Sequence, residues 1–162
     1  MDTHPDLDAL ARRVIAGNRY LTLGTLDPGG APRLSPVFYT AVGHRDFYWV
    51  SAPGSHHSRN LAARPSVALV IFDSTAAIGA GEAVYLSASA RQVGDDELGP
   101  ATAVAFATAK DGVRFTAGEL RGDAELRLYV ARATACDVHV PGSDPRHGSG
   151  IDARRPADPF GD

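Results

Sequence analysis

The residues best suited to chemistry lie in one segment, WVSAPGSHHSRNLAARP, at residues 49–65. A Pro-Gly turn follows a strand there, and Ser55 comes next as a suitable N-cap of a helix. Because Pro65 disfavours a helical conformation at the residue before it, the helix must end near Arg64. The first amides of such a helix have no acceptor within it and favour a phosphate. Polar side chains add further donors, namely those of Ser55, His57, Ser58 and Arg59.

A second interpretation of this segment is a capped surface helix whose polar side chains only face water. The pattern Ser-x-x-Ser-Arg does not by itself separate the two interpretations. The preceding segment, GAPRLSPV at residues 30–37, favours a binding site because it reads as an adjacent strand that supplies Arg33 and Ser35. A strand, a turn and a helix of this composition together predict a site for a phosphorylated cofactor.

Other candidate sites have weaker support. None of the six histidines has the spacing of a zinc site, so no metal site is predicted. A triad can be drawn from Ser55, His57 and Asp73, but the Gly-x-Ser-x-Gly turn of a serine hydrolase is absent from the sequence. Cys136 is the only cysteine, and its place on the apolar side of a strand predicts a buried, unreactive thiol.

Hydrophobic spacing predicts the elements that position these residues. Alternating or continuous apolar runs predict about six strands, at residues 20–26, 33–41, 47–51, 67–72, 83–90 and 125–140. The continuous run at residues 67–72 is expected to be buried on both faces. Helical spacing predicts helices at residues 7–16 and 95–110. Short turns between most strands favour a mainly β protein with an antiparallel barrel and peripheral helices.

Length and composition favour a single domain and exclude several partners. In 162 residues, 16 Lys and Arg nearly balance 19 Asp and Glu, which argues against nucleic acid or an anionic membrane surface. No apolar run approaches the ~20 residues of a membrane span, and the acidic N-terminus is unlike a signal peptide. A cytoplasmic location is therefore expected. Residues 141–162, rich in glycine, proline and charge, are expected to form an irregular tail on a domain of residues 1–140.

Four segments, in this order, resemble the pyridoxamine 5′-phosphate oxidase-like family of FMN-binding split barrels. They are residues 21–25 with GGAPRLSPV, then FYWVSAPGSHHSRNLAARPSVALVIFD, then GEAVYLSASARQV, and the strand at residues 125–140. The resemblance implies a six-stranded antiparallel split β-barrel. It also implies a homodimer that holds FMN, without a covalent bond, in clefts between the subunits.

The resemblance further implies which residues meet the flavin. The strand expected along the isoalloxazine ring, with its first residue nearest the phosphate, consists of Arg33, Leu34, Ser35, Pro36 and Val37. Val50 and Ser51 match the positions that meet the ribityl chain. No residue is implied as a catalytic acid or base.

The resemblance places the phosphate on the turn and helix that carry Ser55, His57, Ser58 and Arg59. Asn60 and Leu61 match helix positions that pack beneath it. Many relatives have lysine or arginine where this chain has His56 and His57. Because histidine is largely neutral near pH 7, cofactor binding here would depend on Arg59 and Arg33 and would weaken at alkaline pH.

The resemblance implies an FMN-binding oxidoreductase whose chemistry belongs to the cofactor. One alternative is a reductase that uses the deazaflavin coenzyme, whose acidic tail would need a basic groove. Lys and Arg are sparse between residues 38 and 90, which favours FMN. Another alternative is a non-catalytic module that binds a flavin or a tetrapyrrole. A pyridoxamine 5′-phosphate oxidase proper is disfavoured because its Arg-rich C-terminal segment has no match beyond Arg146, Arg154 and Arg155.

Overall fold

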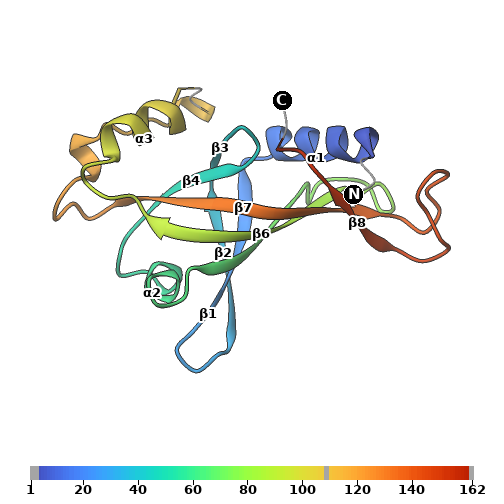
Figure 1. The fold of residues 1–162 in the computed structure, drawn as a ribbon, viewed down its shortest axis with the longest axis horizontal. Helices are drawn as coiled ribbons and strands as arrows, with labels where there is room; N and C mark the ends of the chain where they lie inside the picture. Colours follow the sequence, from blue (N-terminus) through green and yellow to red (C-terminus); the bar gives the residue numbers. More distant parts are fainter. Residues whose placement is uncertain (1–3, 108–109, 161–162) are drawn as a thin grey trace.

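The computed structural model describes residues 4–107 and 110–160, and its main element is a strongly curved antiparallel sheet (Figure 1). Within these ranges the sheet has eight strands in the order β2-β1-β5-β6-β7-β4-β3, with β8 paired to β7. They are β1 (Tyr20–Leu26), β2 (Pro32–Phe38), β3 (Thr40–Val42), β4 (Asp46–Ser51), β5 (Ser66–Phe72), β6 (Ala83–Gln92), β7 (Arg127–Val140) and β8 (Ala153–Ala157).

The two ends of this strand order, β2 and β3, are consecutive in the chain, and β2 also contacts β4. The sheet therefore curls until its two edges meet at a seam, which no ladder of hydrogen bonds closes within residues 4–107 and 110–160. This arrangement confirms the predicted mainly β, antiparallel split barrel.

Helical elements lie around the barrel: α1 (Pro5–Gly17), α2 (His56–Ala63), α3 (Leu98–Ala105) and the 3₁₀ turns η1 (Lys110–Gly112) and η2 (Gly118–Leu120). One apolar stripe of α1 is buried against the sheet, at Leu7, Ala11, Val14 and Ile15. Figure 1 shows α1 near the β8 end of β7 and α3 near its other end. No helix in the described ranges is long and apolar enough to cross a membrane.

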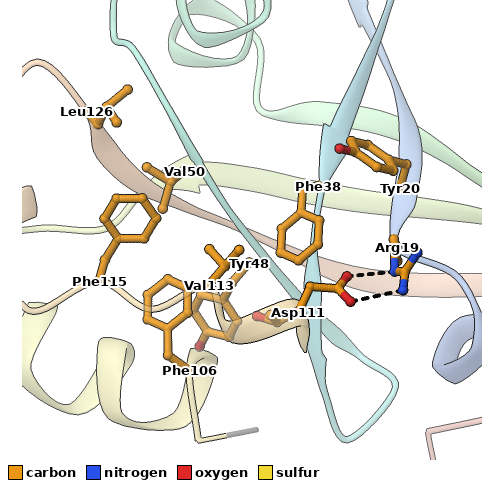
Figure 2. Close-up of a pocket in the computed structure, with 11 residues that line it drawn as sticks. Arg19, Tyr20, Phe38, Tyr48, Val50, Phe106, Asp111, Val113, Phe115 and Leu126 are labelled. Atoms are coloured by element: carbon orange, nitrogen blue, oxygen red, sulfur yellow. Dashed lines mark hydrogen bonds and ion pairs between the residues drawn. The ribbon is translucent and has the colours of Figure 1, made fainter. Parts of the chain in front are cut away.

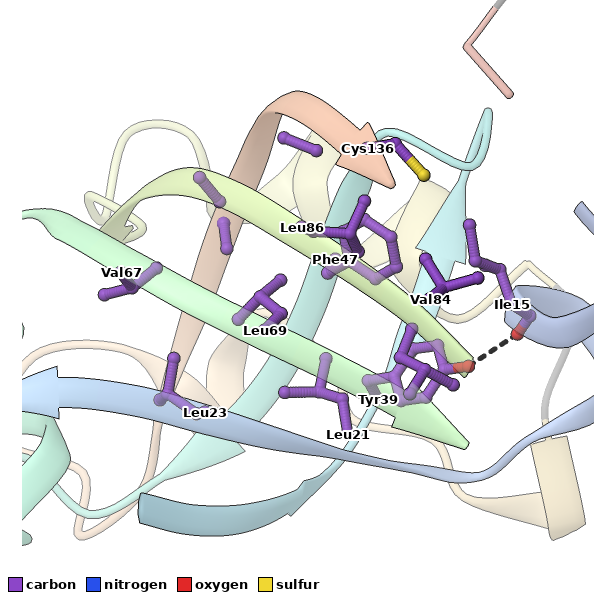
Figure 3. Close-up of a cluster of buried hydrophobic side chains, with 14 of the residues drawn as sticks. Ile15, Leu21, Leu23, Tyr39, Phe47, Val67, Leu69, Val84, Leu86 and Cys136 are labelled. Carbon is purple, nitrogen blue, oxygen red and sulfur yellow. Dashed lines mark hydrogen bonds between the residues drawn. The ribbon is translucent and has the colours of Figure 1, made fainter. Parts of the chain in front are cut away.

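The barrel interior is filled by alternate side chains of the strands. Leu23, Phe47 and Val84, for example, come from three different strands and are completely buried (Figure 3). Tyr39 adds a polar contact, because its hydroxyl donates to the Ile15 carbonyl at 2.5 Å and fixes the end of α1. Cys136 lies in this core, where burial raises the pKa of its thiol to about 12 and keeps it protonated.

The strand predicted to be buried on both faces is covered on only one. In β5, Val67, Leu69 and Ile71 are buried, whereas Ala68 and Phe72 are exposed. A continuous apolar run is typical of a parallel sheet with helices on both faces. Here only the inner face of an antiparallel barrel is filled, and the outer face of β5 stays open.

Three further element predictions change. The extended segment at residues 33–41 divides into β2 and β3, and the helix expected at residues 95–110 covers only Leu98–Ala105. Pro100 is tolerated only in the first turn, so the helix begins just before it. Part of the tail predicted to be irregular forms β8, in which Pro156 lies opposite Asp137. An edge strand of sequence ARRPA is held by backbone pairing with β7, and its side chains show no apolar alternation from which it could have been predicted.

Candidate functional site

A network of hydroxyl groups and one imidazole lies where β4 ends and α2 begins. The Ser55 side chain caps α2 by accepting from the Ser58 amide at 3.3 Å. Its Oγ also donates to Ser58 Oγ at 2.8 Å and lies 3.1 Å from His57 Nε2. The same imidazole nitrogen lies 2.8 Å from Ser51 Oγ, at the end of β4. The structure thus brings together four predicted site residues, here called the serine–histidine cluster: Ser51, Ser55, His57 and Ser58.

The electrostatics of this cluster suit an anion. The cluster contains no carboxylate, and the first amides of α2 have no acceptor within the helix. The pKa of His57 is lowered, first by burial of the ring and then by the neighbouring His56, so the imidazole is neutral near pH 7. Hydroxyls, free amides and a histidine that can take up a proton form a donor set suited to phosphate.

The predicted arginines lie in a neighbouring cavity of about 370 Å³ between α2 and the β1–β2 turn. The basic side chains of its lining, here called the arginine pocket, are those of Arg33, His56, Arg59 and Arg64. His56 and Arg59 share one face of α2, and Arg59 Nη1 donates to the Gly54 carbonyl. This bond links the pocket to the turn before the serine–histidine cluster.

One carboxylate, that of Asp27, moderates the positive charge of the arginine pocket. Arg33 Nη2 pairs with Asp27 Oδ2 at 3.1 Å, while Arg64 Nη1 donates to the Asp27 carbonyl, also at 3.1 Å. The pKa of Asp27 is lowered by the Ala31 amide first and by Arg33 second, so the carboxyl is ionised near pH 7. Three guanidinium groups against one carboxylate leave an excess of positive charge. Arg64 was not a predicted site residue, because it lies past the end of the helix and lines the same cavity as Arg33 only in the folded chain.

The strand predicted to follow the isoalloxazine ring does not present all its side chains to one side. Arg33, Ser35 and Val37 pair with residues of β1 that point into the barrel, and Val37 itself is buried in the core. Leu34 lies on the outer side and is 74% exposed. Because side chains alternate along a strand, a ring on this strand could meet the side chains of only one subset.

Asn60 acts as an anchor of α2. Its Nδ2 donates to Thr25 Oγ1 of β1 at 3.0 Å, and both side chains are buried. Leu61, the next residue of the helix, packs in the core. The anchor fixes the helix relative to the β1–β2 turn, and therefore fixes the two sides of the arginine pocket relative to each other.

Replacing Asn60 with alanine is expected to lower the free energy of unfolding by about 1–3 kcal/mol, because the buried Thr25 hydroxyl would lose its donor. Urea unfolding of Asn60→Ala, Thr25→Val and the double variant measures this contribution. We expect the double variant to lose less than the sum of the single losses. Additive losses would show that the two side chains do not stabilise the fold as a pair.

A second, larger cavity of about 570 Å³ opens at the barrel seam (Figure 2). It is mostly apolar and is lined by Tyr20, Phe38, Thr40, Tyr48, Val50, Phe106, Val113, Phe115 and Leu126, with Arg19 and Asp111 at one side. Of these residues, only Val50 was a predicted site residue. Tyr48 was missed because aromatic residues in strands are more often part of a core, and the other residues come from separate segments of the chain.

Among the residues that the structure describes, no three His, Cys, Asp or Glu side chains gather in a way that could hold a metal ion. An antiparallel barrel whose edges meet at an open seam is the architecture of a split barrel. The family model for pyridoxamine 5′-phosphate oxidase matches residues 7–135, and the chain belongs to this family. No curated protein matches the sequence.

Solved structures share the fold. A heme-binding protein from Mycobacterium smegmatis has a TM-score of 0.68 at 24% identity, over 98% of this chain and 61% of that protein. A pyridoxamine 5′-phosphate oxidase-related, FMN-binding protein from Nostoc punctiforme has a TM-score of 0.60 at 11% identity, over 93% and 94% of the two chains. An F420 reductase has a TM-score of 0.54 at 20% identity, over 80% and 94%. This chain thus spans about three fifths of the length of the mycobacterial protein.

Proposed function

We propose that the chain binds FMN without a covalent bond and acts as a flavin-dependent oxidoreductase. The observation that supports this most directly is the serine–histidine cluster at the start of α2, with Arg59 beside it. Its hydrogen-bond donors are compatible with a phosphate, and none of its four residues has a carboxylate that would repel one. When bound, the flavin would supply reversible acceptance of hydride or electrons.

The residues of this chain would bind and orient the cofactor. Ser55, His57 and Ser58 would donate to the phosphate, and Arg59 would neutralise its charge. Arg33 would reach the same anion if it exchanged its pairing with Asp27 for the phosphate. Ser51 and Val50, which end β4, would lie along the ribityl chain, between the phosphate and the ring.

We also propose that two copies associate through the outer face of the barrel. This face is apolar at exposed positions of β2 and β5, the two strands that flank β1, including Leu34, Ala68 and Phe72. Apolar side chains gathered on an open sheet face are typical of an interface. A second copy would cover them and would bring the outer face of β2, where the ring is expected, into a cleft between subunits.

The direct test is the absorbance spectrum of protein purified without added cofactor, with mass spectrometry of any released ligand. Flavin bands, FMN in the released fraction and a sedimentation mass of two chains would support the proposal. A heme spectrum would contradict it. For protein that loses its ligand on purification, titration with FMN and riboflavin should show tighter binding of FMN, because riboflavin lacks the phosphate.

One observation favours the deazaflavin coenzyme as a second candidate. Lys and Arg are sparse between residues 38 and 90 of the sequence, but Arg33 from outside that range joins Arg59 and Arg64 in the arginine pocket. Such a pocket next to a phosphate site could hold the acidic tail of that coenzyme. Parallel titrations decide between the candidates, since tighter binding of the deazaflavin would replace FMN in the proposal.

The affinity for FMN is expected to fall as pH rises above the lowered pKa of His57 in the free protein. A bound phosphate stabilises the imidazolium and raises this pKa, so binding takes up a proton between the two values. Below the free-state pKa His57 is charged in both states, and above the bound-state pKa it is neutral in both, so its contribution is constant outside this window. In between, affinity falls by up to about tenfold for each pH unit.

Fluorescence titrations of FMN from pH 5 to pH 9 measure this dependence. The His57→Asn variant is the control, because it removes the titrating imidazole of the protein. The ligand is the same in both titrations, so ionisation of the FMN phosphate affects both equally. The same pH profile in both proteins would show that His57 does not contact the phosphate.

A further inference from the structure

The cavity at the seam, here called the aromatic cavity, has the composition of a small-molecule site. Two aromatic pairs contribute to its wall (Figure 2). The ring centres of Tyr20 and Phe38, which meet edge to face, are 5.9 Å apart, and those of Phe106 and Phe115 are 5.8 Å apart. Its volume of about 570 Å³ falls within the range of pockets that bury a small ligand. A space of this size is much larger than the voids of a packed core.

Polar groups occur at few points of this apolar wall. Thr40 lines the cavity and is 6% exposed, and its buried Oγ1 has no hydrogen-bond partner among the described residues. Tyr48 also lines the cavity, and burial of the ring raises the pKa of its hydroxyl, which therefore stays protonated and can donate. Thr40 Oγ1 is itself shielded from solvent, so Tyr48 supplies the hydroxyl that a bound molecule would meet.

Charged side chains of η1, at one side of the cavity, contact residues near the start of β1. Asp111 of η1 has the uncommon left-handed φ of 54°, and its carboxylate pairs with the Arg19 guanidinium at 2.6 Å (Figure 2). The adjacent Lys110 donates to the Asn18 carbonyl at 2.7 Å and lies 4.5 Å from the centre of the Tyr39 ring. These contacts hold η1 beside Arg19, at one side of the cavity.

We propose that the aromatic cavity binds a flat, uncharged aromatic molecule that carries a hydrogen-bond acceptor. Aromatic and aliphatic side chains would enclose the rings, and the Tyr48 hydroxyl would donate to the acceptor. The inference that this molecule is the substrate rests on the proposed flavin function. The inference that the cavity binds such a molecule is independent of that function. Val50 lines the cavity and Ser51, the next residue of β4, belongs to the serine–histidine cluster, so the two sites adjoin along one strand.

The test uses two uncharged fluorescent probes and the full chain. One is 6-propionyl-2-(dimethylamino)naphthalene, which carries a ketone, and the other is N-phenyl-1-naphthylamine, which has none. Both are expected to bind with saturable, blue-shifted emission and to receive energy from Trp49, the only tryptophan in the chain. Trp49 lies between two cavity residues of β4, so a probe in the cavity is within range of this transfer, and variants locate the probe.

Three variants locate the probes. Val113→Phe fills the cavity at a partly exposed position. It is expected to lower the affinity for both probes about tenfold or more, because the added ring takes the space that a probe ring would occupy. Ile78→Phe makes a similar change at a fully exposed position outside the cavity and should leave both affinities within about twofold. Tyr48→Phe should weaken the ketone about three- to tenfold and leave N-phenyl-1-naphthylamine unchanged, because it removes only a hydrogen-bond donor.

Several outcomes would overturn the proposal. The first is the absence of saturable probe binding, which would result if a second copy covered the cavity. The second is equal probe affinity of Val113→Phe and the wild type. The third is an equal loss of affinity for the two probes in Tyr48→Phe. One-for-one displacement of a probe by FMN would also overturn it, by assigning the cavity to the cofactor. Probe binding that persists in protein without affinity for FMN would refute the proposed function alone.

Discussion

Replacing Arg59 with alanine is expected to weaken the binding of FMN by about 10- to 100-fold. A hydrogen bond to a charged group contributes about 1.5–3 kcal/mol, and Arg59 is the guanidinium nearest along the chain to the serine–histidine cluster. Riboflavin, which has no phosphate, should bind the variant within about threefold of the wild type, because the effect acts through the phosphate charge. Titration of both flavins by quenching of their fluorescence measures the two affinities.

The matched control is Arg13→Ala. Arg13 is exposed and pairs with Glu82 on another part of the surface, so its loss changes the net charge by the same amount. Affinity for FMN should be nearly unchanged in this control. If Arg59→Ala and Arg13→Ala behave alike, or if riboflavin loses as much affinity as FMN, the phosphate does not lie at the start of α2.

The second large effect concerns the one-sided burial of β5. Ile71→Ala is expected to lower the free energy of unfolding by about 2–5 kcal/mol, because it removes buried methyl groups and leaves a cavity in the core. Ile71 is completely buried among the strands of the barrel, whereas Ile78, seven residues later, is fully exposed. The same substitution at Ile78 should cost less than about 0.5 kcal/mol.

Urea denaturation of both variants, with the slope of the transition checked for constancy, gives these values. A loss at Ile78 similar to that at Ile71 would mean that a partner or another part of the chain covers the loop. A loss at Ile71 below about 1 kcal/mol would contradict its place in the core.

Local sequence was sufficient for the features that depend on neighbouring residues. Ser55 caps α2 and the helix ends before Pro65, both as predicted, because capping and proline geometry act within a few residues. The grouping of Ser55, His57 and Ser58 also follows from their positions in the first turn of one helix. The barrel itself was predictable from alternating apolar residues and short turns, which favour antiparallel pairing.

Features that need distant residues were harder to predict. The run at residues 67–72 has the same apolar composition whether one face or two are covered, so the sequence could not show that Phe72 is exposed. The ARRPA segment pairs through its backbone, and side-chain patterns carry no signal for that. The aromatic cavity needs Phe38, Tyr48 and Phe115, which come from three segments, and no single segment reveals it.

The sequence by itself determined where α2 begins and which hydrogen-bond donors suited to a phosphate it carries there. The reason is that the turn, the N-cap and the proline that ends the helix lie within about ten residues of one another. It also determined the class of fold through the spacing of apolar residues. Only the tertiary structure decided that Arg33 and Arg64 meet beside Arg59, that Asn60 anchors the helix to β1, and that a cavity stays open at the seam. The reason is physical: a barrel brings together residues far apart in the chain, and the curl of the sheet decides which side chains meet.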